Sequence, residues 1–355
     1  MKKVLALTLT LALAISMVAC SNAPAESTGG EESTPATTEA TYKTGVGAVV
    51  SVSSTDESAE NEKGASAQIN TTIVAATFDG EGKVVSATID VAQQKASFDM
   101  DGAVSGEVDL RTKNEKGDDY GMRGVSEFGK EVNEQHEALA NYWVGKTVEE
   151  CVYMPTYERD ESHSAVPDVV DLKSSVTITV QDYLAALQKA YDNAVETSGP
   201  VVKTGLGIVP SATVTDENAA NEKGASFQMD TSFIVVALGE NDTVVGAYLD
   251  VAQQKVAFDL EGKVSGETDL RTKNEKGDDY GMRGVSEIGK EVGEQHVAFS
   301  QWMVGKTVSE ISGMATYERD EQHTAVPDVE DLKSSVTITV GDYLKAFDKA
   351  VANAK

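Results

Sequence analysis

The chain has only two cysteines, Cys20 and Cys151, so no disulfide framework can hold it together. Its one continuous apolar run, Val4–Val18, is too short to cross a bilayer as a helix. The phosphate-binding loop, the HExxH helix and the GxSxG turn are all absent from the sequence. Stability must therefore come from ordinary hydrophobic cores.

Positive charge is also scarce. The sequence holds 30 Lys and Arg against 58 Asp and Glu, a formal net charge of −28. A chain this acidic repels phosphate backbones, so nucleic acid is excluded as a partner. The same acidity suits a soluble extracellular protein.

The N-terminus is typical of an export signal. Met1–Lys3 is basic, Val4–Val18 is apolar, and the run ends at Met17-Val-Ala-Cys20. A small residue before a cysteine here resembles the bacterial lipoprotein cleavage box, although Met17 stands where the pattern prefers Leu. We expect residues 1–19 to be the signal peptide, Cys20 to carry the lipid, and the chain to be extracytoplasmic and anchored to the cell membrane. Ordinary secretion with cleavage nearby is the alternative.

Residues 20–42 after the cysteine are rich in Ser, Thr, Ala, Glu, Pro and Gly and contain little to bury. This composition is typical of a disordered segment and predicts a tether. Residues 196–202, which include ETSGP, read as a short linker.

The sequence then repeats itself. Residues 43–193 recur at 203–353 with a constant offset of 160, and DLRTKNEKGDDYGMRGVSE at 109–127 returns unchanged at 269–287. A unit of this length is a domain rather than a solenoid repeat. We predict two tandem homologous domains, at 43–195 and 203–355, so any shared site must exist in duplicate.

Within one repeat, the residue pattern predicts an α+β fold, with a mostly antiparallel sheet followed by C-terminal helices. The hydroxyl-rich run SSVTITV alternates like a strand, and Thr179 to Asp182 matches a capping box that opens an amphipathic helix. A second N-cap is predicted at Thr147. The remaining expected elements are a strand at 45–53, a hairpin of 65–78 and 83–91, a loop at 107–126 and a helix at 127–143.

Several polar residues are better explained by structure than by chemistry. The four histidines, two per repeat, lack ligand spacing and are expected to be solvated on helices and loops. The Asp118-Asp119 pair is flanked by basic residues, which favours a charge-balanced loop over a metal site. Cys151 corresponds to Ile311 in the second repeat, which favours apolar packing. The histidines are His136, His163, His296 and His323.

Tyr120 and its repeat equivalent Tyr280 stand in the polar loop, each followed by a glycine that permits a tight turn. An aromatic face with a hydroxyl could line a ligand pocket, or the loop could simply pack its own aromatic side chain. Both interpretations remain open from the sequence.

The most informative segment is Asp171–Thr177, DLKSSVT, with its copy at Asp331–Thr337. It resembles the Asp-x-x-Ser/Thr-Gly/Ser-Ala-Thr/Ser motif of the FMN-binding domains found in flavin-carrying subunits of sodium-pumping NADH:quinone reductases and Rnf complexes, and in surface flavoprotein lipoproteins. Val176 and Val336 stand where the family has Ala, so a modifying enzyme must accommodate a bulkier residue. The matching residues are Asp171, Ser174, Ser175 and Thr177, and Asp331, Ser334, Ser335 and Thr337.

This resemblance implies that a flavin transferase joins FMN to Thr177 and Thr337 through a phosphoester. Each threonine precedes a predicted helix N-terminus, where a phosphate is favoured. The hairpin at 74–91 and the V-G-K-T sequence ending at Thr147 are also similar to the family. From the pattern alone, Thr177 is better explained as the solvent face of a strand, and non-covalent FMN binding is a further alternative.

The resemblance implies a lipid-anchored electron carrier with FMN on each domain, rather than an enzyme with its own substrate. Electrons would pass from a membrane quinone reductase or similar donor to an external acceptor. The alternative is a surface ligand-binding lipoprotein whose FMN-type fold has lost the flavin.

Overall fold

The computed structural model describes residues 41–355. The predicted signal peptide, Cys20 and nearly all of the predicted tether therefore lie outside the described residues. The described part belongs to one compact unit. It combines helices with antiparallel sheets, which confirms the predicted α+β class.

The first repeat contains one four-stranded sheet in the order β3-β2-β1-β6, a two-stranded sheet of β4 and β5, and helices that follow the main strands. Its elements are β1 (Tyr42–Thr55), β2 (Ser66–Asp79), β3 (Val84–Ser97), α1 (Lys113–Lys116), α2 (Val132–Trp143), α3 (Val148–Val152), β4 (Thr156–Tyr157), β5 (Val166–Pro167), α4 (Gln181–Asp192) and β6 (Val195–Glu196).

The second repeat forms the corresponding series, with the sheet order β10-β9-β8-β7 and a two-stranded sheet of β11 and β12. Its elements are β7 (Lys203–Thr215), β8 (Ser226–Leu238), β9 (Val244–Phe258), β10 (Val264–Ser265), α5 (Lys273–Lys276), α6 (Val292–Met303), α7 (Val308–Ser312), β11 (Thr316–Tyr317), β12 (Val326–Pro327) and α8 (Gly341–Ala352).

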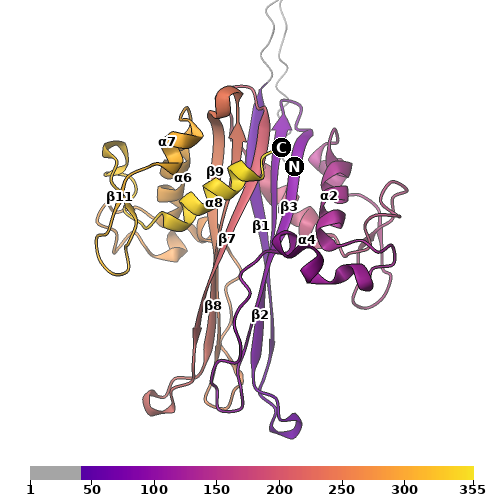
Figure 1. Cartoon of the computed structure of the whole chain (residues 1–355), viewed down its shortest axis with the longest axis vertical. Coiled ribbons are helices and arrows are strands. Elements are labelled where there is room, and N and C mark those ends of the chain that lie inside the picture. Colours follow the sequence, from indigo (N-terminus) through magenta and orange to yellow (C-terminus); the bar gives the residue numbers. More distant parts are fainter. Residues whose placement is uncertain (1–40) are drawn as a thin grey trace, which may run out of the picture. The chain divides into compact units, whose positions relative to one another are not determined.

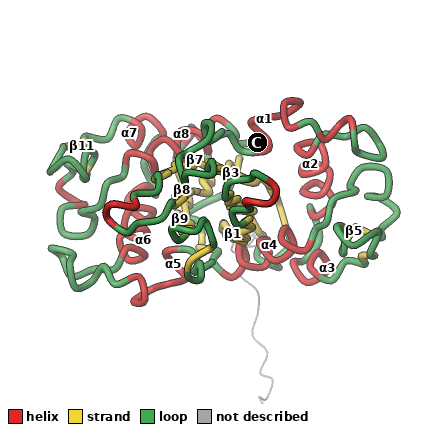
Figure 2. Tube along the Cα trace, turned by 90° about the horizontal axis from the view of Figure 1, so that it is seen from below, coloured by secondary structure: helices red, strands yellow, loops and turns green. Residues whose placement is uncertain are grey.

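Each main sheet is buried on both faces. Along β2, Ile73 and Ala75 point into a cluster shared by the two repeats, whereas Val74 and Ala76 pack against the helices of the first repeat. The alternation follows from the two-residue period of a strand. Figures 1 and 2 show the consequence, with the strands in the centre and the helices outside them.

We call the shared cluster the central core. It contains buried side chains from both repeats, including Ile69 and Phe98 from the first and Phe227 and Phe258 from the second. The rings of Phe98 and Phe258 meet edge to face with centroids 5.5 Å apart. Each repeat also has a separate cluster between its sheet and its helices.

Contacts between the repeats occur in matched pairs. The Glu57 N–H donates to the Gly262 carbonyl at 2.9 Å, and Glu217 donates to Gly102 at 2.9 Å. Such reciprocal contacts are the signature of a two-fold, self-complementary interface. The two repeats thus share a core, and strand β6 crosses the boundary predicted at residue 195.

The predicted linker is hydrogen-bonded to both copies. The Thr197 N–H donates to the Tyr42 carbonyl at 3.0 Å, and the Ser198 N–H donates to the Val245 carbonyl at 2.8 Å. Val202 donates in turn to Leu238 at 2.8 Å. This segment therefore follows the surfaces it connects.

Most of the predicted elements are present. The hairpin is formed by β2 and β3, and Thr147, predicted as an N-cap, caps α3 in a capping box with Glu150. The helix predicted at 127–143 begins only at Val132, so Phe128 lies outside it with 44% of its surface exposed.

Within residues 41–355, no helix has the length and apolarity needed to span a membrane.

Two predictions for the segment before α4 are wrong. Residues 171–175 form turns and residues 176–180 no strand, because the Ser175 and Val176 N–H groups both donate back to the Leu172 carbonyl. The capping box at Thr179 is also absent, since Val180 is the N-cap residue and no side chain caps the helix. The Thr179 hydroxyl is buried without a hydrogen-bond partner.

Candidate functional site

Thr177 lies on the turn segment between β5 and α4, at the edge of a cleft of about 600 Å³. The equivalent cleft at Thr337 has a volume of about 330 Å³. Both clefts hold a threonine, a valine, a tyrosine, a lysine and a Val-Pro pair at matching positions. The lining residues of the first are Glu127, Phe128, Tyr157, Val166, Pro167, Asp168, Lys173, Val176 and Thr177.

The Thr177 side chain is held from the buried side of the cleft. Its hydroxyl donates to Gln135 Oε1 at 3.3 Å, and its backbone N–H donates to the same oxygen at 2.8 Å. Arg159 Nη1 donates to the Thr177 carbonyl at 3.0 Å. Only 9% of Thr177 is exposed, so the expectation of an open hydroxyl on a strand face is wrong.

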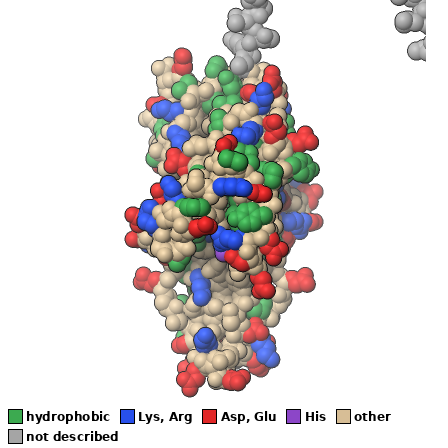
Figure 3. All heavy atoms as spheres, turned by 90° about the vertical axis from the view of Figure 1, so that its right-hand side faces the viewer, with side chains coloured by type: hydrophobic (Ala, Val, Ile, Leu, Met, Phe, Trp, Pro, Cys, Tyr) green, Lys and Arg blue, Asp and Glu red, His purple; other side chains and the backbone are tan. Residues whose placement is uncertain are grey.

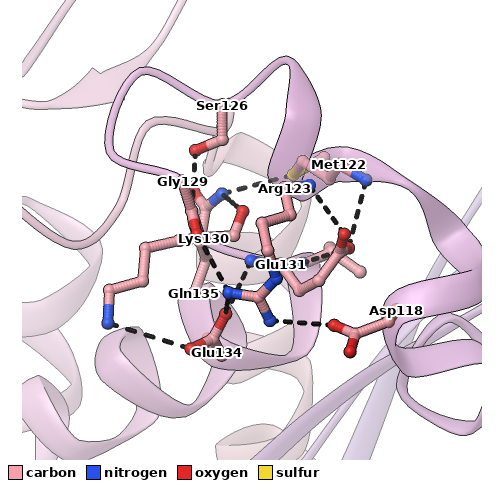
Figure 4. A network of polar contacts seen from close by, with 10 residues as sticks. Asp118, Met122, Arg123, Ser126, Gly129, Lys130, Glu131, Glu134 and Gln135 are labelled. Carbon is pink, nitrogen blue, oxygen red and sulfur yellow. Dashed lines mark hydrogen bonds and ion pairs between the residues drawn. The ribbon is translucent and has the colours of Figure 1, made fainter.

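Gln135 also fixes the loop at residues 122–130, because its Nε2 donates to Met122 Sδ at 3.2 Å and to the Lys130 carbonyl at 3.3 Å. The Glu131 carboxylate accepts the backbone N–H groups of Met122 and Arg123. Figure 4 shows these groups converging beneath the loop. A fully buried glutamine thus connects the loop that carries Phe128 with the threonine across the cleft.

The other motif residues have distinct environments. Asp171 and Ser174 are exposed, whereas Ser175 is half-buried and donates its hydroxyl hydrogen to the Leu172 carbonyl at 3.3 Å. Val176 is buried, with 1% of its surface exposed. Of the predicted first-repeat set, only Thr177 lines the cleft, although Val176 and Lys173 lie beside it. The copy has the same pattern, with Asp331 and Ser334 exposed, Ser335 half-buried and Thr337 in the cleft.

The cleft has the chemical features that FMN requires. Thr177 offers a hydroxyl for a phosphoester, and Lys173 supplies a cation that now pairs with Asp168 at 2.8 Å. Tyr157, which is 43% exposed, presents a flat aromatic face for a planar ring. The cleft volume lies within the usual range for small-molecule sites. The residues present therefore fit the group.

Tyr120 and Tyr280 are not among the residues that line these two clefts. The Tyr120 hydroxyl donates to Gln93 Oε1 at 3.3 Å, and Lys113 lies over its ring at 5.1 Å. Tyr280 has the same two partners in the second repeat, Gln253 and Lys273. Gly121 has a φ of 81°, which confirms the tight turn expected after the tyrosine.

The prediction of solvated histidines is wrong for His136 and His296, which are buried in α2 and α6. The ring of His136 contacts Asn114 Oδ1 at 2.8 Å and the Tyr183 hydroxyl at 3.1 Å. Burial lowers the pKa of His136 to about 3, and that of His296 also to about 3, so both rings are neutral. A signal was available, because His136 lies four residues after Val132 and three before Leu139 on the helix face that is buried.

His163 and His323 are partly exposed on loops, as expected. His163 Nδ1 lies 2.6 Å from Asp160 Oδ1, and His323 repeats the contact with Asp320 at 2.7 Å. Each pair supports a local turn.

The buried carboxylate of Asp90 was not predicted from the sequence. Asp90, 8% exposed, accepts the Thr112 hydroxyl at 2.6 Å and the N–H groups of Asn114 and Val91. Burial raises the pKa of Asp90 to about 6, and that of its equivalent Asp250 to about 7. The sequence offered a weak signal, because Asp90 stands between the apolar residues Ile89 and Val91 as the one acidic residue of the strand.

The charge-balanced loop at Asp118-Asp119 and the packing role of Cys151 are confirmed. Asp118 pairs with Arg123 and Asp119 pairs with Arg111, each at 2.8 Å, so the loop is charge-balanced. Cys151 is fully buried, and burial raises the pKa of its thiol to about 12. Within residues 41–355, no group of three or more His, Cys, Asp or Glu side chains is arranged to hold a metal ion.

Comparison with known proteins gives one informative similarity. The chain is 32% identical over 166 residues to a chlorophenol reductase of Desulfitobacterium hafniense, an alignment that covers 35% of this chain and 50% of that protein. The chain thus matches about half the length of the relative. No protein-family model matches the chain. No solved structure matches it either.

Proposed function

We propose that this protein is a membrane-anchored extracytoplasmic flavoprotein that carries FMN on each repeat. It passes electrons between a membrane donor and an external acceptor. The observation that carries the proposal is the duplicated cleft in which Thr177 and Thr337 face a lysine and an aromatic ring. The similarity to a protein named as a reductase supports a redox role.

Each residue of the cleft has a defined part in this proposal. Thr177 provides the oxygen that bonds to the FMN phosphate, and its hydroxyl proton is lost as a flavin nucleotide donor releases its own leaving group. Lys173 exchanges its ion pair with Asp168 for one with the phosphate, while Tyr157 offers a face for the ring. The FMN, when attached, supplies the one- and two-electron chemistry.

The backbone of Thr177 is held by hydrogen bonds, which supports this residue as a fixed attachment point for FMN. Gln135 and Arg159 restrain the backbone on both sides of the residue, through hydrogen bonds of 2.8 and 3.0 Å. The point at which a cofactor would be joined is thus held in place. Restraint of this kind suits a carrier whose partner distances must be reproducible.

The test is co-expression of the full chain with a flavin transferase, followed by denaturation, gel fluorescence and intact-mass measurement. We expect two FMN additions, each less one water. Thr177→Ala and Thr337→Ala should each remove one addition, and the double variant should remove both. Thr179→Ala is the matched control, because Thr179 lies two residues away and does not line the cleft.

Unmodified protein after co-expression, with a known flavin acceptor modified in the same cells, contradicts the covalent proposal. Flavin retained by the Thr177→Ala/Thr337→Ala double variant, but lost on denaturation, would instead show non-covalent binding.

A second candidate is a surface ligand-binding protein that has lost its flavin. The observation that favours it is the burial of Val176 and Thr177, with 1% and 9% of their surfaces exposed. The Val176→Ala/Val336→Ala variant distinguishes the two. If it gains flavin while the parent gains none, the valines block attachment and the ligand-binding function is supported.

A further inference from the structure

A cavity of about 370 Å³ lies between the two repeats. Strand β3 and helix α1 of the first repeat line one side, and strand β7 and helix α8 of the second repeat line the other. It shares no lining residue with the threonine clefts. The residues on which the argument depends are Thr88, Asp90, Asn114, Leu206, Ile208 and Lys349.

The repeat supplies an internal reference for this cavity, because the equivalent of Thr88 is Tyr248. The Tyr248 side chain packs against the central core, and its hydroxyl accepts a hydrogen bond from Asn274 Nδ2 at 3.3 Å. Burial raises the pKa of Tyr248, and the neighbouring carboxylates of Asp250 and Glu275 raise it further. Asn274, Asp250 and Glu275 are the equivalents of Asn114, Asp90 and Glu115, which line the cavity.

In the second repeat a phenol therefore stands at the position that Thr88 holds beside the cavity of the first. Thr88 has no ring, whereas the first repeat retains the equivalents of the polar groups near the Tyr248 hydroxyl. Asn114 Nδ2 donates to the Ile89 carbonyl at 2.7 Å, just as Asn274 Nδ2 donates to Leu249 at 2.9 Å. The amide is held in the same place in both copies.

The walls of the cavity suit an aromatic ring. Leu206 and Ile208 are buried apolar residues, with 3% and 4% of their surfaces exposed. At the mouth, Lys349 Nζ pairs with Glu115 Oε1 at 2.6 Å, which neutralises the lysine. The same pair neutralises Glu115, which leaves the Asp90 carboxylate to disfavour an anionic occupant, so a neutral phenol is preferred over a phenolate or a benzoate.

We propose that this cavity binds one small neutral phenol per chain. The ligand's ring lies against Leu206 and Ile208, and its hydroxyl meets Asn114 beside Asp90, in the arrangement that Tyr248 adopts in the second repeat. The site does not depend on flavin attachment, since none of its residues lines either threonine cleft.

The test is calorimetric titration of the full chain with 4-methylphenol, which has the ring, hydroxyl and para carbon of a tyrosine side chain. We expect one equivalent to bind. Thr88→Tyr should abolish binding because the new side chain fills the site. Tyr248→Thr should open a second site and raise the stoichiometry to two. Toluene and 4-methylbenzoate should bind at least tenfold more weakly, through loss of the hydroxyl and repulsion by the Asp90 carboxylate.

Thr88→Val is the matched control, because it changes the same position without filling the cavity and should keep the single site. Absence of 4-methylphenol binding to the parent chain overturns the proposal. Binding that survives in Thr88→Tyr, or that is equally strong for toluene, overturns it as well. If Tyr248→Thr does not fold, the comparison of Thr88→Tyr with Thr88→Val decides the question alone.

Discussion

At the scale of single residues, Gly47 allows helix α4 to lie directly on strand β1. A Cβ atom at Gly47 would collide with the Ala186 carbonyl oxygen and the Ala190 nitrogen, both of them backbone atoms of the helix. Gly207 has the same relation to Ala346 and Ala350 in α8. Such close contact cannot be relieved by a side-chain rotation.

We predict that Gly47→Ala lowers the free energy of unfolding by about 1–3 kcal/mol, because the helix must move away from the sheet. Urea unfolding followed by circular dichroism measures it. Gly124→Ala is the control, since nothing lies within 4 Å of a Cβ placed there. Equal stability of the two variants would contradict the packing described.

The buried histidines predict a pH dependence. The folded pKa of His136 is about 3 against about 6.5 in the unfolded chain, so only the unfolded state gains a proton between these values. His136 and His296 therefore destabilise the fold as the pH falls below 6.5. Asp90, with a folded pKa of about 6, has the opposite effect between pH 6 and 4.

Replacing both histidines by glutamine should expose the contribution of the aspartates. Relative to the parent, the His136→Gln/His296→Gln variant should gain on the order of 2–3 kcal/mol per histidine when the pH is lowered from 7 to 4.5. Denaturant titrations at the two pH values measure the change. A stability difference that does not vary with pH would show that these rings are accessible to protons.

At the scale of elements, the sequence was most reliable where a local interaction decides the structure. Thr147 caps α3 because its hydroxyl reaches the Glu150 N–H and Glu150 reaches back. The same reasoning failed at Thr179, because the helix begins one residue later and the threonine side chain is buried. The strand predicted from the alternating sequence SSVTITV is also absent, because N–H groups at its start donate to the Leu172 carbonyl and form a turn.

The two threonines predict contrasting variants. Thr147→Ala should cost about 1 kcal/mol of stability through the lost cap. Thr179→Ala should cost little or stabilise slightly, because it removes a buried hydroxyl that has no hydrogen-bond partner. Thermal unfolding of both variants in parallel measures this contrast, and the reverse order would refute the assignment of the caps.

The candidate site was predictable only in part. The motif pointed to Thr177 and Thr337, which line the clefts. Nothing local indicated Gln135, which lies 42 residues before Thr177 and accepts hydrogen bonds from its N–H and hydroxyl. Phe128 was assigned to a helix, and its place in the cleft depends on the Arg123 and Glu131 contacts of its loop. Long-range hydrogen bonds of this kind leave no periodic signal.

At the scale of the whole molecule, the described residues present acidic groups broadly rather than at one site. Figure 3 shows one face, with Asp and Glu spread over it and Lys and Arg between them. Reciprocal ion pairs join the repeats, Lys189 to Glu275 and Lys349 to Glu115, both at 2.6 Å. The duplication that was plain in the sequence thus produces an interface, which the sequence did not reveal.

A shared core predicts one cooperative unfolding transition for the described part of the chain. Phe227→Ala, which opens a cavity in the central core, should lower the midpoint of that whole transition by an amount equivalent to about 3–5 kcal/mol. Differential scanning calorimetry measures it. Two separate transitions, of which only one moves, would show that the repeats fold independently.

The central claim is that Thr177 and Thr337 carry flavin, and the intact mass of the natively expressed protein tests it most directly. The account predicts two FMN additions, each less one water, which peptide mapping places on these two threonines. An unmodified mass, from cells whose flavin transferase is active on another acceptor, would contradict it.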